Sequence, residues 1–473
     1  MHYVSTRGEN AGLTFDDVLL AGLARDGGLY VPEEWPAFGA AEIAAWKDLS
    51  YVELAMKVMT PFVGDALAEA ELRRIVTDAY SHFDTPEVAP LKPIGHNEWL
   101  MELFHGPTLA FKDVALQFLG PLFDHVLAAR GERICIVGAT SGDTGSAAIE
   151  ACRDRDNIDI FILYPHERVS EVQRRQMTTV GAANVHTIAL EGTFDDCQDA
   201  VKALFNDIPF RDRMKLSAVN SINWARIMAQ IVYYFWGALK VGGPETPVTF
   251  AVPTGNFGNV FAGYAAAQMG LPVKQLIVGS NANDILTRFF ETGAMKIGQV
   301  VPTISPSMDI QISSNFERLL HELYRRDGAK VAQTMATFRD EGRFAVEAEV
   351  LAAARELFDG GRFDDEQTRI LIDAHYVATD ELLDPHTAVG LSAGRALRKD
   401  TAVPMIALAT AHPAKFPDAV EDATYRRPDL PAHLADLYER DERINVLAND
   451  LDAVRAFIED RVEVTGASGG AAA

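Results

Sequence analysis

Apolar runs along the chain alternate with amphipathic stretches and glycine-containing turns. One series runs through RICIVGA, SAAIEAC and IDIFILYP between residues 133 and 165, then through NVHTIAL and FDDCQDAVKALF. The same order returns in VTFAV, VFAGYAAAQMG and VKQLIVGS between residues 248 and 280. Strands that are apolar on both faces and alternate with amphipathic helices are typical of parallel sheets covered on both sides. The pattern therefore predicts an α/β fold with parallel sheets.

The other parts of the chain favour helices. The N-terminal part combines short apolar helical stretches with turns such as DGGLYVPEEWP, and a later region includes SNFERLLHELYRR before the buried strand PMIALATAHP. The small-residue tail TGASGGAAA is predicted to be disordered coil. We expect a mainly helical N-terminal domain at 1–92, a core at 93–437 with a helical insertion near 284–400, and a C-terminal helix and flexible tail at 438–473.

The composition is that of a globular protein, with 48% apolar and 23% charged residues in a chain of 473. The formal net charge of −24 argues against a surface for nucleic acid or anionic membranes, so an anionic substrate needs local positive contacts. The N-terminus MHYVSTRGEN lacks the apolar segment of a secretory signal, and no apolar run reaches the length of a membrane span. We therefore expect a cytoplasmic protein without nucleic-acid or membrane partners.

The cysteines and histidines do not indicate a metal site or a disulfide framework. The 3 cysteines are widely spaced and form no CxxC pair, which fits a reducing compartment. The sequence has no HExxH helix, DxD-type cluster or GxSxG elbow, and His105, His386 and His412 lack a second histidine at ligand spacing. We expect no bound metal.

The first candidate for chemistry is Lys112 in the stretch HGPTLAFK. A helix is expected to begin there, with Thr108 as its N-cap and Asp113 in its first turn. A helix N-terminus and apolar neighbours both disfavour an ammonium group, so the amine would become a nucleophile of the kind that forms Schiff bases. The alternative, favoured by this stretch alone, is a lysine that extends its charged end into solvent.

The second candidate is the loop PTGNFGN, which joins an apolar strand to an apolar helix and places glycines at 255 and 258. Glycines there allow backbone N–H groups to converge, and the following helix adds its positive end, so the loop could bind a phosphate. The loop is neither a Walker motif nor GxGxxG. A tight turn without a ligand is an equally good interpretation of the loop alone.

Two further turns could bind anions. GATSGDTGSA carries Thr140, Ser141, Asp143 and Thr144 where a helix starts, and these hydroxyls and backbone donors suit a carboxylate. Simple N-capping by Ser141 or Asp143 is the better interpretation of this turn alone.

The other turn is NSINWARIMAQ, in which Asn220, Ser221 and Asn223 precede an apolar helix and Arg226 lies one turn inside it. In so acidic a chain an arginine beside hydroxyl and amide donors indicates an anion site. The alternative is an ordinary capped helix with a surface arginine.

Together these four features form a coherent set. A Schiff-base lysine and a glycine-rich phosphate loop are what pyridoxal phosphate needs. Two additional anion-binding turns would suit an amino-acid substrate that carries its own phosphate.

In this order, HGPTLAFKD, TSGDTGSAA, NSINWAR, PTGNFGN, SSNFERLL and ATAHPAKF resemble the threonine synthase family. The opening YVSTRG and LTFDDVLLAGLARDGGLYVP resemble the N-terminal domain of its longer form, so the resemblance covers nearly the whole chain. It implies pyridoxal 5'-phosphate as cofactor and fold type II, similar to the tryptophan synthase β subunit. In that fold two parallel-sheet α/β subdomains enclose the cofactor, here with a mainly helical N-terminal domain.

The resemblance also implies residue roles, and the chain shows no departure at the positions concerned. Lys112 would form the Schiff base with the cofactor and later act as the catalytic base, and Thr410 would face the pyridine nitrogen. The cofactor phosphate would be held by Gly255, Asn256, Phe257, Gly258 and Asn259. The substrate carboxylate would be bound by Thr140, Ser141, Asp143 and Thr144, and the substrate phosphate by Ser221, Asn223 and Arg226 together with Asn256.

The reaction implied is conversion of O-phospho-L-homoserine and water to L-threonine and phosphate, the last step of threonine biosynthesis, by a monomer or homodimer. The alternatives are another fold-type-II lyase, such as a serine or threonine dehydratase or a phospho-amino-acid lyase. From other classes, a Rossmann-type dehydrogenase or a non-catalytic amino-acid-binding protein would share the βαβ pattern. Arg226 argues against a dehydratase, because the substrate of that enzyme carries no phosphate.

Overall fold

The computed structural model of the protein describes residues 1–8, 12–140, 142–218 and 221–462. The chain forms two compact units, Met1–Leu119 with Ser221–Pro431 and Gly120–Asn220 with Ala432–Ala473, so the boundary falls inside helix α5 (Lys112–Arg130). The first unit is built on a mainly parallel sheet and the second on a parallel sheet, which confirms the α/β prediction. Among the described helices, none combines the length and apolar character needed to cross a membrane. The expected coil TGASGGAAA lies outside the described residues.

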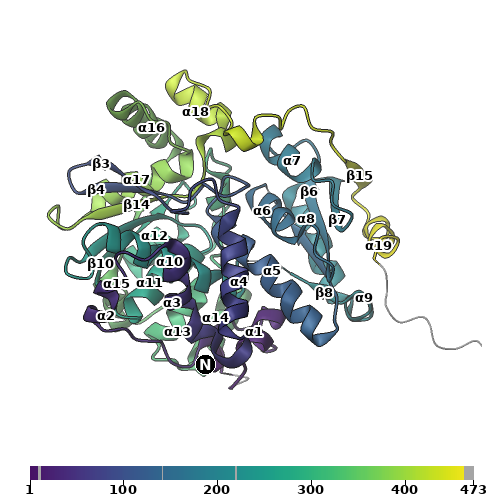
Figure 1. The fold of residues 1–473 in the computed structure, drawn as a ribbon, viewed down its shortest axis with the longest axis horizontal. Helices are drawn as coiled ribbons and strands as arrows, with labels where there is room; N and C mark the ends of the chain where they lie inside the picture. Colours follow the sequence, from purple (N-terminus) through teal and green to yellow (C-terminus); the bar gives the residue numbers. More distant parts are fainter. Residues whose placement is uncertain (9–11, 141, 219–220, 463–473) are drawn as a thin grey trace, which may run out of the picture. The chain divides into compact units, whose positions relative to one another are not determined.

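The first unit contains a six-stranded sheet in the order β13-β10-β9-β14-β4-β3 (Figure 1). The strands are β3 (Leu91–Gly95), β4 (Glu98–Glu102), β9 (Val248–Pro253), β10 (Val273–Ser280), β13 (Phe358–Arg362) and β14 (Met405–Ala409). All neighbouring pairs are parallel except β3 with β4. Strands β9 and β14 are buried along their whole length, which explains their continuous apolar sequence. Their carboxyl ends meet at one edge of the sheet.

This unit contains helices before, within and after the stretch 284–400, which is mainly helical. They are α10 (Trp224–Lys240), α11 (Gly258–Gln268), α12 (Ile285–Thr292), α13 (Phe316–Leu323), α14 (Gly328–Glu341), α15 (Ala348–Leu357), α16 (Asp365–Thr379), α17 (Pro385–Leu397) and α18 (Pro417–Thr424). Helix α17 packs on the sheet, where Leu391 joins Ala251 and Ala407 in one apolar cluster. Three short strands in the helical region were not predicted, namely β11 (Ala294–Lys296), β12 (Arg343–Ala345) and β13.

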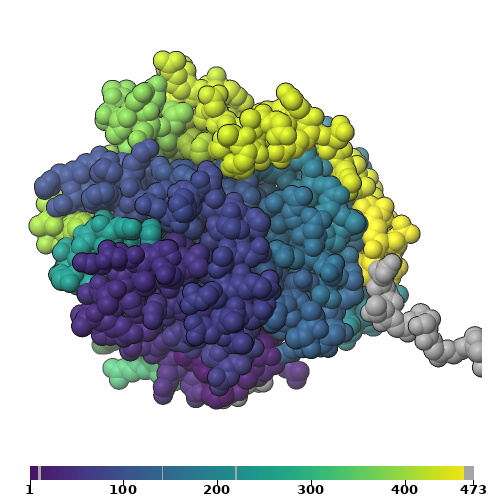
Figure 2. Space-filling view, viewed as in Figure 1, coloured from purple at the N-terminus to yellow at the C-terminus, as the bar shows by residue number. Residues whose placement is uncertain are grey.

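The N-terminal segment of this unit is mainly helical, as expected. It contains β1 (Tyr3–Ser5), α1 (Phe15–Ala21), β2 (Tyr30–Pro32), α2 (Ala40–Ala44), α3 (Tyr51–Val63) and α4 (Glu69–Ser81). Ser50 caps α3 by accepting from the N–H of Glu53. Helix α3 packs against α10, where the rings of Tyr51 and Trp236 lie 5.5 Å apart. The helices of this segment form a continuous surface, purple to dark blue in Figure 2.

The second unit has a five-stranded parallel sheet in the order β15-β7-β6-β5-β8. Its strands are β5 (Ile134–Ala139), β6 (Ile158–Pro165), β7 (Val185–Glu191), β8 (Leu216–Ser217) and β15 (Asn445–Ala448). Its further helices are α6 (Asp143–Cys152), α7 (Glu171–Thr178), α8 (Phe194–Asn206), α9 (Ile208–Met214) and α19 (Leu451–Glu459). Alternate strand residues, such as Val137 and Leu163, pack into one core with Leu204 and Val454. This alternation places α8, α9 and α19 over the same face of the sheet.

Candidate functional site

Two segments far apart in the sequence lie side by side at the carboxyl edge of the first sheet. The N–H of Phe111 donates to the carbonyl of Thr410 at 2.8 Å, and the N–H of His412 donates to Leu109 at 3.0 Å. Between these bonds Ala110 and Ala411 form an antiparallel bridge. The structure therefore brings the residue that precedes Lys112 against the strand end that carries Thr410.

Lys112 is the first residue of α5, as the sequence predicts, and its side chain is partly buried. Its Nζ atom lies 5.2 Å from the centre of the Phe111 ring. The prediction of Thr108 as the N-cap is wrong, because the helix begins four residues later. Instead, the N–H and hydroxyl of Thr108 donate to the carboxylate of Asp113 at 2.8 and 2.7 Å.

A buried lysine that the sequence did not single out supports the same turn. Lys415 is fully buried, and its Nζ atom donates to the carbonyl of Thr108 at 2.7 Å. Gly106 is also required there, because a Cβ atom at this position would lie 2.4 Å from the Cβ of Asp113. The turn that leads into Lys112 is therefore fixed by buried polar contacts on both sides.

In the glycine loop between β9 and α11 (residues 255–259), two carbonyl groups are engaged by hydrogen bonds from a neighbouring segment. The carbonyl of Asn256 accepts from the backbone and side-chain N–H groups of Asn315, both at 3.0 Å, and the carbonyl of Gly255 accepts from Ser313 Oγ at 2.8 Å. Phe257 has a φ of 63°, a conformation that turns the chain into α11. Within the described ranges, no backbone N–H between residues 255 and 259 donates to another protein atom.

Side chains at the two glycines of the loop would be crowded. A Cβ atom at Gly255 would lie 3.0 Å from the carbonyl oxygen of Ser307, and one at Gly258 would lie 3.3 Å from Asn315 Nδ2. A compact loop with carbonyls fixed behind it and N–H donors at a helix start fits a phosphate group. This geometry favours the phosphate-binding interpretation over a simple turn.

Arg226 lies in the first turn of α10 and is only 3% exposed. Its Nε and Nη1 atoms are buried and have no hydrogen-bond partner among the described residues. Burial, which disfavours the charged form, lowers the pKa of Arg226 to about 10. The alternative of an ordinary surface arginine is therefore wrong. A buried cation with unsatisfied donors is unfavourable unless an anion binds to it.

The amide of Asn259 is a further unsatisfied donor, and it contacts tyrosines of α10. Tyr233 lies on the same face of α10 as Arg226, and its hydroxyl donates to Asn259 Oδ1 at 2.6 Å. The hydroxyl oxygen of Tyr234 lies 3.0 Å from the same Oδ1 atom. Asn259 Nδ2 is buried and has no partner in the described chain. The two tyrosines therefore fix the amide with its N–H group available.

Ser221 and Asn223 have different surroundings. Ser221 Oγ lies 3.2 Å from Ser314 Oγ, which in turn donates to Asn256 Oδ1 at 3.4 Å. Asn223 caps α10 by accepting from the N–H of Ala225 at 3.0 Å, and its Nδ2 donates to the carbonyl of Leu19 at 2.9 Å. The capping interpretation therefore accounts for Asn223. Asn220 lies outside the described residues.

Arg318 on α13 connects three segments around the glycine loop. It is fully buried and bonds to Asn315 Oδ1, and its Nε and Nη2 atoms donate to the carbonyls of Tyr30 at 3.0 Å and Ile222 at 2.6 Å. Burial lowers its pKa to about 9. Arg318 was not predicted from the sequence, although a Glu-Arg pair inside the apolar stretch SSNFERLL was a usable signal.

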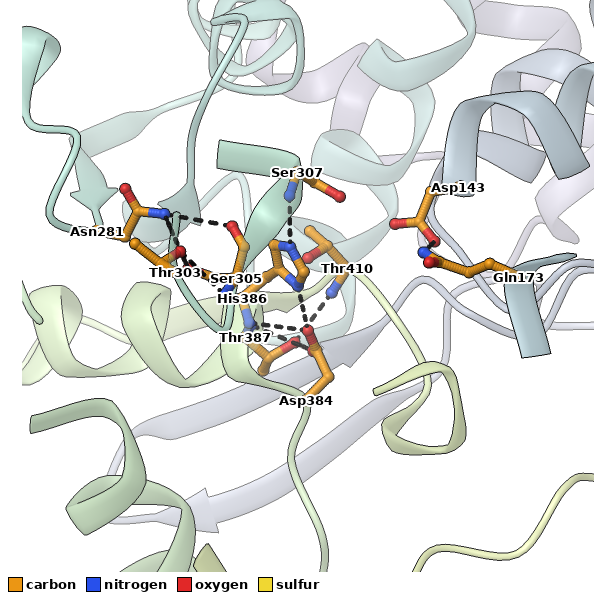
Figure 3. A network of polar contacts seen from close by, with 10 residues as sticks. All are labelled: Asp143, Gln173, Asn281, Thr303, Ser305, Ser307, Asp384, His386, Thr387 and Thr410. Carbon is orange, nitrogen blue, oxygen red and sulfur yellow. Dashed lines mark hydrogen bonds and ion pairs between the residues drawn. The ribbon is translucent and has the colours of Figure 1, made fainter. Parts of the chain in front are cut away.

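The turn before α6 belongs to the second unit. Thr140 Oγ1 accepts from the N–H groups of Gly142 at 3.0 Å and Gly145 at 2.9 Å. Thr140 therefore provides the acceptor for backbone N–H groups at the start of α6. Asp143 Oδ1 accepts from Gln173 Nε2 at 3.0 Å (Figure 3). Thr144 is partly buried in the first turn, and Ser141 lies outside the described residues.

Thr410 follows β14 and is 6% exposed. Its N–H donates to Thr387 Oγ1 at 3.1 Å, and Thr387 belongs to a buried group with Asp384 and His386 (Figure 3). In the described part of the chain, no hydrogen bond engages the Thr410 hydroxyl. That group is available to a ligand at the edge of the sheet. The same described residues contain no cluster of three or more metal-ligating side chains.

Three family models match the chain in sequence. Threonine synthase N terminus matches residues 2–80, pyridoxal-phosphate dependent enzyme matches residues 84–373, and threonine synthase C-terminal matches residues 387–458. Threonine synthase of Pseudomonas aeruginosa is 58% identical over 97% of this chain and 98% of its own length.

Solved structures agree with these matches. Pyridoxal-phosphate-bound threonine synthase from Brucella melitensis has a TM-score of 0.96 and 54% identity, covering 98% of this chain and 99% of its own. Yeast threonine synthase has a TM-score of 0.92 and 39% identity, covering 97% and 98%. These similarities confirm fold type II, pyridoxal phosphate as cofactor and a lyase acting on a small molecule. The chain belongs to the threonine synthase family of pyridoxal-phosphate-dependent enzymes.

Proposed function

We propose that the protein converts O-phospho-L-homoserine and water to L-threonine and phosphate, the last step of threonine biosynthesis. The observation that supports a phosphorylated substrate is the buried guanidinium of Arg226, whose Nε and Nη1 atoms have no hydrogen-bond partner in the described chain. The glycine loop already offers the cofactor phosphate a set of backbone donors, so Arg226 supplies a second anion site.

Lys112 is proposed as the residue that binds the cofactor through its amine and then serves as the base. Pyridoxal phosphate supplies an electron sink for the Cα–H bond of a bound amino acid. Freed by the substrate amine, the Lys112 amine would take a proton from Cα and release it again before it takes one from Cβ. Phosphate would leave from Cγ, water would add its hydroxyl at Cβ, and protons would return to Cγ and Cα, so that Lys112 ends as a neutral amine.

The residues around Arg226 are proposed to bind and stabilise the leaving phosphate. Arg226 offers a positive charge in a water-poor environment, where a fixed donor stabilises developing negative charge strongly. Ser221 and Asn256, which are linked through Ser314, complete the set of donors. Asn223 supports this site as a helix cap, because its amide is already engaged by Ala225 and Leu19.

The turn at the start of α6 is proposed to bind the substrate carboxylate. Ser141 and Thr144 provide hydroxyl groups, while Thr140 holds the turn through its bonds to Gly142 and Gly145. The side chain of Asp143 accepts from Gln173 and would repel a carboxylate, so its contribution is its backbone N–H in the first helical turn.

The experiment that tests this function is an assay of inorganic phosphate and threonine formed from O-phospho-L-homoserine. The expected result is stoichiometric release of both products. The second candidate, a dehydratase, predicts formation of 2-oxo acids from serine or threonine instead. The buried cation argues against it, because neither substrate carries a phosphate for Arg226 in addition to its carboxylate.

We also propose that the enzyme works in the cytoplasm as a monomer or homodimer, without nucleic acid or membrane partners. The acidic balance, with a formal net charge of −24, supports this proposal. The domain limits 1–92, 93–437 and 438–473 remain our proposal for the functional division of the chain. Arg318 donates to the carbonyl of Tyr30 in the N-terminal domain and to that of Ile222, next to Ser221. This supports a role for the N-terminal domain in holding the segment proposed to bind the substrate phosphate.

A further inference from the structure

One buried carboxylate lies behind the cofactor site proposed above. Asp384 precedes α17 and is 1% exposed. Its Oδ1 accepts from the N–H of Thr387 at 3.2 Å and from the Thr387 hydroxyl, and its Oδ2 accepts from the N–H of His386 at 2.9 Å. The same oxygen lies 2.8 Å from His386 Nδ1 (Figure 3). Asp384 therefore orients two consecutive side chains.

The first of these side chains reaches the end of β14. Because the Thr387 hydroxyl donates its hydrogen to Asp384, its oxygen is free to accept the N–H of Thr410, 3.1 Å away. This bond fixes the backbone of the residue whose hydroxyl is proposed to face the pyridine nitrogen. Asp384 thus acts on the ring end of the site through Thr387.

The second side chain reaches the wall of the phosphate loop. The N–H of Ser307 donates to His386 Nε2 at 3.1 Å. A backbone N–H can only donate, so Nε2 carries no proton, and the ring proton lies on Nδ1, where Asp384 accepts it. Phe416 packs against the ring at 4.7 Å between centroids, and His386 is 3% exposed. The tautomer and orientation of the ring are therefore fixed.

Ser307 belongs to the short helix η2 (Pro306–Met308), whose backbone lies against Gly255. A Cβ atom at Gly255 would be 3.0 Å from Ser307 O and 3.3 Å from Met308 Cα. The bond from Ser307 to His386 therefore fixes the segment that closes one side of the phosphate loop.

We propose that Asp384 and His386 are positioning residues that set the two ends of the cofactor site relative to each other. His386 acts on the phosphate end through Ser307, and Asp384 acts on the ring end through Thr387 and Thr410. This inference rests on the proposed function, because it uses the proposed placement of the cofactor.

The test compares His386→Gln with His386→Asn in apoprotein titrated with pyridoxal phosphate. Glutamine can place an acceptor near the Nε2 position and meet Ser307, whereas asparagine reaches only the Nδ1 position. We expect affinity within about threefold of wild type for His386→Gln and on the order of tenfold weaker for His386→Asn, the loss of one hydrogen bond. The phosphorus chemical shift of the bound cofactor should change in His386→Asn alone. Equal affinity and equal phosphorus shifts in both variants overturn the proposal.

A second pair of variants tests the same bond from its other side, in case the histidine variants fold poorly. Ser307→Pro removes the backbone N–H, while Ser307→Ala keeps it. Ser307→Pro should bind pyridoxal phosphate more weakly than Ser307→Ala and should shift the phosphorus signal as His386→Asn does. The same affinity and signal in the two serine variants contradict the proposal.

Borohydride reduction of each loaded variant separates this inference from the function on which it rests. Labelling of Lys112 together with equal behaviour of the matched variants overturns only the positioning role. Labelling of a different lysine overturns the proposed function itself, and the positioning role with it.

Discussion

The backbone N–H of Phe111 donates to the carbonyl oxygen of Thr410 at 2.8 Å, so the residue before Lys112 is tied to the strand end that carries Thr410. The bridge between Ala110 and Ala411 extends this contact. The role proposed for Lys112 needs such a fixed backbone position, because small displacements of a catalytic group lower rates severely. The pairing brings the segments HGPTLAFK and ATAHPAKF together in the structure.

The first prediction concerns Lys112. The loaded enzyme should be yellow, and borohydride should fix the cofactor to the peptide that contains Lys112. Lys112→Ala should still bind the cofactor loosely and release no phosphate, because both the covalent link and the base are lost. Peptide mass spectrometry and phosphate release measure the two effects. Lys415→Met is the control, and here labelling at Lys112 should persist even if stability falls.

The second prediction concerns Arg226, whose unsatisfied donors are proposed to bind the substrate phosphate and not the cofactor phosphate. Arg226→Gln should retain cofactor content and weaken turnover of O-phospho-L-homoserine, with a loss of about 1.5 to 3 kcal/mol in transition-state stabilisation for each charged hydrogen bond. Cofactor absorbance and steady-state kinetics are the measurements. A parallel loss of cofactor and activity would show that Arg226 binds the cofactor phosphate instead.

The third prediction concerns Arg7 and Glu317. Arg7 Nε and Nη2 both donate to the carboxylate of Glu317 at 2.9 Å, and the Glu317 side chain is 4% exposed. Arg7→Met should destabilise the protein by on the order of 3 kcal/mol, because it leaves a buried carboxylate without its cation. Arg73→Met, which breaks an exposed pair, should change stability by less than about 0.5 kcal/mol. Urea unfolding compares the two, and similar losses would contradict the prediction.

The fourth prediction concerns the pH dependence of stability at His105. Burial acts to lower the pKa of His105, but hydrogen bonds and charges from Glu102 and Asp84 outweigh it, so the pKa is raised above 6.5. The ring nitrogens lie 2.9 and 2.7 Å from these carboxylates. A raised pKa means that the contribution is fully present below pH 6.5 and is lost as pH rises through the folded-state pKa.

His105→Asn should therefore cost more free energy of unfolding at pH 6 than at pH 9, as measured by urea unfolding across that range. Glu102→Gln should reduce this difference, because one of the two acceptors of the imidazolium is removed. A cost for His105→Asn that does not vary with pH would refute the assignment.

The sequence predicted the elements whose signal is local. Strands β6 and β10 each contain an uninterrupted apolar run, and their predicted limits match the structure. Strand β13 was missed because FDGGR has no apolar run, and its place beside β10 depends on tertiary pairing. Asp384 and His386 were missed for a similar reason, since their role depends on Ser307 and Thr410, which lie far from them in sequence. The burial of Arg226 was also not predictable, because an arginine at this helical position is usually solvated.

The last prediction concerns Thr410, whose hydroxyl is not engaged by the described residues while its backbone is fixed by Phe111 and Thr387. Facing the pyridine nitrogen, a neutral hydroxyl would leave the ring largely unprotonated and would limit carbanion build-up at Cα, which suits an enzyme that must move charge on to Cβ and Cγ.

Thr410→Asp should protonate the ring, shift the absorbance of the cofactor and lower the ratio of threonine to abortive products such as 2-oxobutyrate. Thr410→Ser is the matched control, because it keeps a neutral hydroxyl and should have a small effect on spectrum and product ratio. The backbone bonds to Phe111 and Thr387 do not depend on the side chain, so both variants should keep the strand end in place. If Thr410→Asp leaves the spectrum and the product ratio unchanged, the Thr410 hydroxyl does not face the ring, and another group must set its protonation.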